Sequence, residues 1–496
     1  MREIRSAVQD RLAAIHILQT EEGAGEELSR TVSCRETLSF EELCSRVRLY
    51  MEQEWELFDD FEKQERLERE RAAILGDERQ MSFYKARIDE LINTQGLRAE
   101  TPPWYESLTE GVFAELYGLA GLSPWVYDKT EEYRNSSSAK LIGDRLYCLI
   151  DGRSCLQPQR IGRERREQLK RTFLMSSPRE RQEKGFHELY LRNGIRVTIY
   201  SGDRTKPEQE IMVFRKYLLR ELSFESMAEL GTIPYAAIPL FKSMVSIGFN
   251  VLFAGTVRTG KTTFLQTWQS YESPELEGLA ISTDPETPWE KIMPTAPIMQ
   301  LVADGEELEG ITKSLLRGDN DYVILEEMRD AQSYRLSLEL AAIGEGRCKA
   351  TVHTADVSNL PYRMASRIRD KYGGDEQGLI LQVFRSFDYV FEFCQTRGNR
   401  AEKRLKSISE LCYSLETDRV SIHRICVYDE LGDEWQWNFH IGDDKEEKLR
   451  YAPQDREFMA KELRLLAENK PILGCGVIYP GYYHSSSENE VKKCLN

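Results

Sequence analysis

The chain has 496 residues, of which 41% are hydrophobic and 30% charged, and its formal net charge is −16 at pH 7. These values predict a soluble globular protein of about two to four domains. The acidic balance argues against non-specific binding of nucleic acid over the whole surface. The ten cysteines form no CxxC pair and the six histidines are dispersed, which favours reduced thiols over a disulfide framework or a zinc site.

Neither apolar region of interest predicts a membrane segment. The N-terminal MREIRSAVQDRLAAIHILQTEEG lacks the apolar core of a signal peptide. The most apolar long window, IPYAAIPLFKSMVSIGFNVLFAG, contains Lys242 and ends in a glycine loop, so it predicts a helix, a turn and a strand. If the protein works at a membrane, we therefore expect a partner to recruit it.

The first 228 residues predict two regions. Residues 36–100 are rich in Glu, Arg, Leu and Phe and predict charged amphipathic helix, whose charges favour a solvated face over a binding site. The prolines of TPPWYESL mark a boundary, so residues 1–105 are expected to be a helical extension. Strand-like runs such as RLYCLID and GIRVTIYSG then alternate with helical segments, which predicts a small α/β domain over residues 106–228.

Residues 229–400 predict a central parallel sheet. Short apolar runs alternate there with helical segments, and this pattern is typical of parallel crossovers in an α/β fold. The runs are NVLFAG, LAIST, IMQLVAD, DYVILEE, CKATVHT and DYVFEFC. Residues 401–496 are expected to form a C-terminal extension, with two more strand-like runs and no chemistry that the sequence reveals.

A phosphate-binding motif follows the first of these runs. The octapeptide from Gly255 to Thr262 fits GxxxxGK[ST], and its backbone N–H groups, followed by a helix N-terminus, form a cradle for phosphate oxygens. An ordinary glycine turn is the alternative, and the strand before and helix after the motif disfavour it. The residues expected to contact the nucleotide are Gly255, Thr256, Val257, Arg258, Thr259, Gly260, Lys261, Thr262 and Thr263.

Two further strand ends supply candidate catalytic side chains. DYVILEEMRD places Glu326 and Glu327 where an apolar run ends, and a carboxylate there can activate water or hold Mg²⁺ through water. His353 ends the next apolar run, CKATVH. A lone histidine is more often structural, but its place beside the expected phosphate site favours a functional role.

These residues also bear a family resemblance. LLRGDNDYVILEEMRD and DAQSYRLSLELAAIGEGRCKATVHTAD resemble the catalytic and histidine boxes of the secretion and pilus-assembly ATPase superfamily (type II/IV secretion). GIRVTIYSG and VFRKY resemble segments that precede the phosphate loop in that family. The resemblance spans about residues 186–395 and is closest to the Tad/Flp pilus type (CpaF-like).

The resemblance implies a role for each matching residue. Lys261 and Thr262 would bind phosphate and Mg²⁺, and Glu327 would be the catalytic carboxylate beside the metal. His353 would sense the γ-phosphate, and Arg215 would reach the phosphates from the N-terminal domain. Arg317 and Arg329 match family arginines near the site.

The resemblance also implies the architecture and the partners. We expect a RecA-like P-loop core, an N-terminal α/β domain that closes over the nucleotide, and an N-terminal helical extension. The expected assembly is a cytoplasmic homo-hexamer that uses ATP and Mg²⁺ and is recruited peripherally to the cytoplasmic membrane. Inner-membrane platform proteins would be its partners and a pilin-like protein its indirect substrate, with no nucleic acid expected.

Several departures from the family pattern keep two alternatives open. Glu326 replaces the glycine before the catalytic Glu, Asn320 replaces a proline, and Arg258 occupies a position where small residues are common. The acidic box ISTDPETP has only Asp284 and Glu286 in place of a Glu-Asp pair. These departures favour a degenerate ATP-binding assembly subunit with little hydrolysis. A nucleic-acid motor is the second alternative, and the acidic balance argues against it.

Overall fold

The computed structural model describes residues 38–480, apart from 56–59, 177–184, 192–193, 207–208, 217–221, 284–286, 304, 316, 344–345, 415–418 and 475. The chain divides into two compact units. One comprises residues up to Pro124 together with Ile161–Ser176, and the other comprises Trp125–Arg160 and the residues from Ser177 onward. Among the helices of the described residues, none combines the length and the apolar character that a membrane crossing requires.

The first unit is helical. Its elements are α2 (Phe40–Trp55), α3 (Asp60–Ile74), α4 (Glu78–Thr94), α5 (Leu108–Tyr117), η1 (Ala120–Leu122), α6 (Ser123–Val126, which runs into the second unit) and α8 (Arg163–Ser176). Ser39 and Glu42 form a capping box at the start of α2, with Ser39 N donating to Glu42 over 2.9 Å. Asp77 caps α4 in the same way, so the region expected to be amphipathic helix contains three separate helices.

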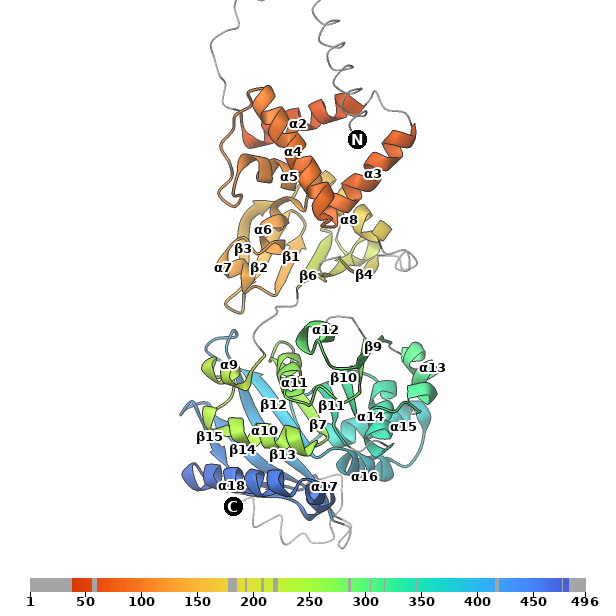
Figure 1. Ribbon diagram of the computed structural model, residues 1–496, viewed down its shortest axis with the longest axis vertical. Helices are drawn as coiled ribbons and strands as arrows, with labels where there is room; N and C mark the ends of the chain where they lie inside the picture. The colour runs from red at the N-terminus through yellow and green to blue at the C-terminus, as the bar shows by residue number, and fades with distance from the viewer. Residues whose placement is uncertain are drawn as a thin grey trace, which may run out of the picture. The chain divides into compact units, whose positions relative to one another are not determined.

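The second unit begins with a six-stranded antiparallel sheet (Figure 1). Its order is β3-β2-β1-β6-β5-β4, with β1 (Ser138–Ile142), β2 (Arg145–Ile150), β3 (Arg153–Arg160), β4 (Phe186–Tyr190), β5 (Arg196–Tyr200) and β6 (Ile211–Arg215). The short helices α7 (Glu131–Arg134) and η3 (Gly202–Arg204) accompany it. Alternate residues of β5 and β6 are buried, as expected for a sheet with one covered face.

A ten-stranded sheet forms the rest of the second unit, and its parallel part follows the order β12-β7-β11-β10-β8-β9. The strands are β7 (Val251–Gly255), β8 (Gly278–Ser282), β9 (Ile298–Val302), β10 (Tyr322–Met328), β11 (Cys348–His353) and β12 (Tyr389–Gln395). Strand β11 separates the phosphate-loop strand β7 from β10, which is the strand order of a RecA-like core. The predicted α/β fold class is therefore confirmed.

The same sheet continues antiparallel beyond β12. The added strands are β13 (Lys403–Ser414), β14 (Arg419–Asp429), β15 (Glu434–Trp437) and β16 (Val477–Ile478). Strand β13 pairs with β12 along its length, so the expected core and the expected C-terminal extension share one sheet. The domain boundaries at residues 105, 228 and 400 remain predictions.

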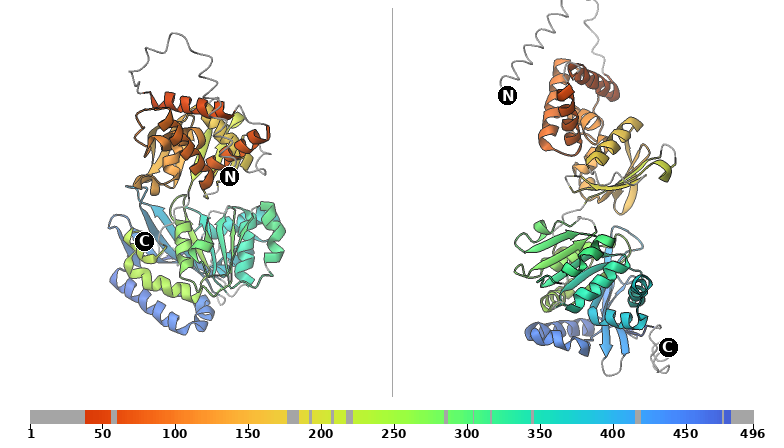
Figure 2. Two further views of the ribbon diagram at one scale, coloured as in Figure 1. Left: turned by 45° about the horizontal axis from the view of Figure 1, so that its top comes forward. Right: turned by 90° about the vertical axis from the view of Figure 1, so that its right-hand side faces the viewer.

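Helices cover both faces of this sheet (Figures 1 and 2). Val251 and Phe253 of β7 contribute to one hydrophobic cluster, and Leu252 and Ala254 to another, because successive side chains of a strand point to opposite faces. The helices are α9 (Phe224–Glu229), η4 (Tyr235–Ala237), α10 (Ile238–Ile247), α11 (Lys261–Ser270), α12 (Trp289–Ile292), α13 (Gly305–Leu315), α14 (Ala331–Ile343), α15 (Leu360–Tyr372), α16 (Glu376–Ser386), η5 (Asp443–Lys445), α17 (Glu446–Tyr451) and α18 (Pro453–Asn469).

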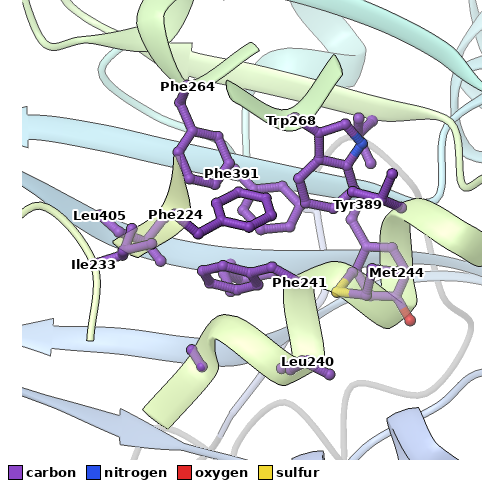
Figure 3. Packing of buried hydrophobic residues seen from close by; sticks show 14 of the residues in the cluster. Phe224, Ile233, Leu240, Phe241, Met244, Phe264, Trp268, Tyr389, Phe391 and Leu405 are labelled. Atoms are coloured by element: carbon purple, nitrogen blue, oxygen red, sulfur yellow. The ribbon is translucent and has the colours of Figure 1, made fainter. Parts of the chain in front are cut away.

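An aromatic cluster fixes the helix that follows the phosphate loop (Figure 3). Phe264 and Trp268 of α11 are fully or almost fully buried, and the ring of Trp268 lies 5.1 Å from that of Phe391 on β12. Phe224 and Phe241 pack against Phe264 from α9 and α10. Burial of each such ring stabilises the fold by about 1.5–3 kcal/mol. This packing holds α11 and the loop at its N-terminus in place.

Candidate nucleotide-binding site

The phosphate loop connects β7 to α11 and needs glycine at its first position. Gly255 has φ 143°, a region that L-residues with side chains avoid. A Cβ at this position would also collide with the carbonyl oxygen of Phe393 and lie 2.7 Å from Thr259 Oγ1. Thr259 in turn donates to the carbonyl oxygen of Thr256 over 2.9 Å, and this bond closes the loop on itself.

The loop keeps its shape although Arg258 stands where a small residue is common. Arg258 adopts φ 64°, in the left-handed region that glycine favours, at a cost of about 1–2 kcal/mol. Its carbonyl oxygen accepts a hydrogen bond of 3.1 Å from Gln395 Nε2 at the end of β12, which holds this conformation. Arg258 is exposed, and the contacts that the cradle offers to phosphate come from backbone N–H groups. Gly260, at φ 91°, completes the turn into α11.

Lys261 is buried and lies across the loop. Its Nζ donates to the carbonyl oxygen of Thr256 over 2.8 Å and lies 3.4 Å from His353 Nδ1. Burial lowers the pKa of Lys261 to about 8, and the nearby carboxylate of Glu327 opposes that shift. The ammonium is therefore poorly solvated, and a phosphate group would give it a stronger partner than a carbonyl oxygen.

The two adjacent glutamates form a β-bulge in β10. The pairing of β10 with β11 runs from Leu325 opposite Ala350 to Met328 opposite Val352, so Glu326 and Glu327 together face one residue, Thr351. Thr351 Oγ1 donates to the carbonyl oxygen of Glu326, which satisfies a backbone group that the bulge frees from the ladder. Bulges beside active sites redirect side chains, and here the redirected side chain is that of a carboxylate.

Glu327 lies at the centre of a charged network. His353 Nε2 lies 2.9 Å from Glu327 Oε1, and Arg329 donates to Oε2 over 2.5 Å. Burial raises the pKa of Glu327, but the hydrogen bonds from His353 and Arg329 outweigh it, so the pKa falls to about 2. An ammonium can only donate, so Lys261 makes His353 Nδ1 the acceptor and leaves the proton on Nε2. His353 therefore donates to Glu327.

Glu326 has a different environment, which the sequence did not reveal. It is buried, and its carboxylate accepts a 2.7 Å hydrogen bond from Trp289 Nε1 and a 3.0 Å bond from Thr287 Oγ1. Gln266 of α11 donates to the same Thr287 hydroxyl over 3.0 Å. Glu326 thus ties Thr287 and Trp289 to β10 and, through Thr287, to α11. No local motif marks Thr287 or Trp289 for this role.

The other predicted residues fall into two groups. Thr262 and Thr263 lie on the first turn of α11, beside the loop. Arg317 is exposed in the turn before β10, and seven residues of strand place that turn roughly 20 Å from Glu327. Its catalytic role stays a prediction. Arg215 is exposed at the end of β6, and its contact with phosphate also stays a prediction.

Part of the acidic box ISTDPETP lies outside the described residues. Its candidate carboxylates, Asp284 and Glu286, lie in that part. Asn320 is partly buried in the turn before β10.

The lowered pKa of Lys261 predicts a pH-dependent affinity for nucleotide. Above pH about 8 the free site loses the ammonium that attracts phosphate, so affinity falls as pH rises. We expect the Kd of Mg-ATP to increase about tenfold between pH 7 and pH 9. Calorimetry in buffers of different ionisation enthalpy should show proton uptake on binding at pH 8.5. Equal Kd values at pH 7 and pH 9 would contradict the assignment.

Comparison with known families agrees with this geometry. Residues 205–430 match the type II/IV secretion system protein family. The matched segment contains β6, the phosphate loop, both glutamates, His353 and most of the large sheet. The matched segment is slightly less than half of the chain and is similar to that family.

Similar individual proteins share little sequence with the chain. An uncharacterized protein of Bacillus anthracis is 24% identical over 176 residues, which are 35% of this chain and 38% of that protein. The chain thus spans less than half the length of this curated relative. The Legionella pneumophila ATPase DotB is 14% identical, over 75% of this chain and 91% of that one, with a TM-score of 0.42.

Two more solved structures are similar at the same level. The pilus retraction motor PilT with bound ADP is 14% identical, over 70% of this chain and 89% of that one, with a TM-score of 0.42. The VirB11 ATPase of the Brucella suis type IV secretion system is 15% identical, over 58% of this chain and 95% of that one, with a TM-score of 0.31. Likenesses this distant assign no function.

Proposed function

We propose that the protein is an ATPase that powers pilus assembly or protein secretion through a membrane platform. The observation that supports this most strongly is the position of Glu327, which a bulge directs toward His353 and the phosphate-loop lysine. A carboxylate with a pKa of about 2 stays charged at neutral pH. It can therefore orient a water molecule for attack on a terminal phosphate.

Each residue of the network has a distinct task in this proposal. The loop N–H groups and Lys261 bind the phosphates, and they neutralise the charge that grows on the leaving oxygens. His353 donates to Glu327 in the free protein, and a γ-phosphate would compete for the same Nε2 proton. His353 would then report nucleotide occupancy to Glu327. Arg329 holds Glu327 from the other side.

The residues present also fit a magnesium ion. Mg²⁺ in nucleotide sites takes a hydroxyl or carboxylate oxygen from the protein together with phosphate oxygens and water. Thr262 offers a hydroxyl on the first helical turn, and Glu327 offers a charged carboxylate nearby. Because both oxygens of Glu327 already accept hydrogen bonds, we infer that Glu327 would act on the ion through water. Bound Mg²⁺ would supply charge neutralisation at the phosphates.

The finer parts of the proposal are the assembly, the location and the pilus type. We propose a homo-hexamer at the cytoplasmic face of the membrane, recruited by platform proteins, with a pilin-like substrate of the Tad/Flp type. These proposals rest on the resemblance of the LLRGDNDYVILEEMRD and histidine-box segments and on the family match over residues 205–430.

A second candidate is an ATP-binding assembly subunit with little hydrolysis. The existing contacts of the site favour this candidate, because Lys261 donates to Thr256 and Glu327 is paired with both His353 and Arg329. Binding of nucleotide has to break part of this network before Glu327 can engage water. Single-turnover and steady-state phosphate release from the purified full chain decide between the two candidates. A bound ATP that persists for hours would favour the assembly subunit.

Arg215 tests the proposed closure of the N-terminal domain. A guanidinium can form two parallel hydrogen bonds to a phosphate, and a clamp that forms with the transition state mainly affects rate. We expect Arg215→Ala to lower kcat about 10²–10³-fold and to weaken ATP binding only a few-fold. Arg153→Ala, at an exposed arginine of β3 on the same sheet, should leave both quantities unchanged.

Sedimentation tests the assembly. With a non-hydrolysable ATP analogue the parent chain is expected to shift to a ring-sized species, and Arg215→Ala is expected to shift less. A parent chain that stays monomeric at high concentration with saturating analogue would refute the hexamer. It would then favour the second candidate.

A further inference from the structure

The C-terminal part of the large sheet brings together a cysteine and two histidines that are far apart in sequence. Cys412 lies on β13, His423 on β14, and His440 in the segment after β15. One potential ligand atom from each lies within 4.8 Å of the other two. Nothing in the phosphate-loop site requires this cluster.

Strand register places the cluster on one face of the sheet. Glu410 pairs with His423 and Cys412 pairs with Ser421. Directly paired residues share a face, and so do residues two apart along a strand. His440 covers this face with its ring stacked on that of His423, at a centroid distance of 3.5 Å.

Each imidazole has one nitrogen engaged, which leaves the other for a ligand. His440 Nδ1 lies 2.5 Å from a carboxylate oxygen of Glu410, and a donor there leaves the lone pair on Nε2. His423 Nε2 lies 3.0 Å from Ser421 Oγ, whereas its buried Nδ1 has no hydrogen-bond partner. A carboxylate behind a histidine is the arrangement that orients histidine ligands in metal sites.

The surroundings of the cluster also favour a cation. The Glu410 carboxylate is fully buried and accepts hydrogen bonds from Gly442 N and Tyr389 Oη over 2.9 and 3.2 Å. A buried anion is stabilised by a nearby positive charge. The side chain of His440 is 30% exposed, so an ion has a path from solvent.

We propose that Cys412, His423 and His440 bind a zinc ion. Thiolate and imidazole are ligands that Zn²⁺ takes in proteins, and three protein ligands leave a fourth position for water. Ligand atoms in such a site lie roughly 3.5 Å apart, so binding draws the three side chains together. Stacked imidazole rings direct their nitrogen lone pairs in parallel, so they cannot both point at one ion. Binding therefore also requires the two rings to tilt out of their stacked arrangement. The bound ion would hold β13, β14 and the segment after β15 together.

Cobalt replaces zinc as a spectroscopic probe in the first experiment. The full chain is stripped of metal, freed of nucleotide and titrated with Co²⁺. We expect one equivalent to bind with a thiolate-to-cobalt charge-transfer band, and Zn²⁺ to displace it. Cys412→Ser should abolish the band, whereas Cys394→Ser, at a half-buried cysteine of β12, should retain it. A parent chain without the band, or a Cys412→Ser variant with it, would overturn the proposal.

Further variants separate ligands from neighbours. His423→Gln and His440→Gln should each weaken Co²⁺ binding more than tenfold. Glu410→Gln should weaken it about 10–100-fold and keep the band, because Glu410 only positions His440.

Zn²⁺ should raise the melting temperature of the parent, and a chelator should reverse the rise. The absence of a zinc-dependent shift in the parent refutes the site even if a variant fails to fold. Lys261→Ala should bind Co²⁺ like the parent, so failure of the nucleotide proposal would leave this result intact.

Discussion

Replacing Glu327 with glutamine is expected to lower ATP turnover about 10²–10⁴-fold, while ATP binding remains within a few-fold of the parent. The amide has nearly the same shape, but it cannot accept a proton from attacking water. It also loses the charge that His353 and Arg329 stabilise. Phosphate release and calorimetric binding on the same preparation measure the two effects separately.

Glu326→Gln is the matched control for this experiment. Glu326 is the other residue of the bulge, and it accepts hydrogen bonds from Trp289 and Thr287. We expect its replacement to lower the free energy of unfolding by about 1–3 kcal/mol and to change turnover only a few-fold. If both variants lose turnover equally, the two carboxylates act together and the assignment of Glu327 as the single base is wrong.

Replacing Lys261 with alanine is expected to weaken ATP binding about 10–100-fold, since a charge-assisted hydrogen bond contributes about 1.5–3 kcal/mol. The fold should persist, because Gly255, Thr259 and Gln395 hold the loop without the lysine. Removing a buried ammonium should even leave the melting temperature unchanged or raise it slightly.

Lys242→Ala provides the control for charge alone. Lys242 is an exposed lysine of α10 that pairs with Glu225, away from the phosphate loop. Its removal changes the net charge of the protein by the same amount, and the Kd of ATP should stay as in the parent. If Lys261→Ala also binds ATP as tightly as the parent, the nucleotide site lies elsewhere.

The sequence by itself determined the parts of the protein that short-range patterns encode. An apolar strand, a glycine loop and a helix lie next to one another in the chain, so the motif from Gly255 to Thr262 could be located to the residue. The alternation of strands and helices likewise predicted the parallel sheet. The turn at Gly248, with φ 84°, ends α10 just before β7, as the helix–turn–strand interpretation of that apolar window requires.

Strand β13 shows where such patterns fail. Ser407, Ser409 and Glu410 are buried within it, so its sequence lacks the apolar run that marks the other strands. Its polar side chains have hydrogen-bond partners on other segments, such as Glu392 of the neighbouring β12 for Ser407 and His440 for Glu410. Only pairing with β12 makes this segment part of the core sheet.

The tertiary structure alone decided how the surroundings of neighbouring residues differ. Only the family resemblance distinguishes the neighbouring Glu326 and Glu327 in the sequence, whereas in the structure a bulge opposite Thr351 buries one against Trp289 and turns the other toward His353. The dispersal of cysteine and histidine in the sequence argued against a metal site, but strand register places Cys412 and His423 on one face and the fold brings His440 beside them. In both cases the decisive contacts join residues that are distant in the chain, and local periodicity contains no information about which distant segments will pair.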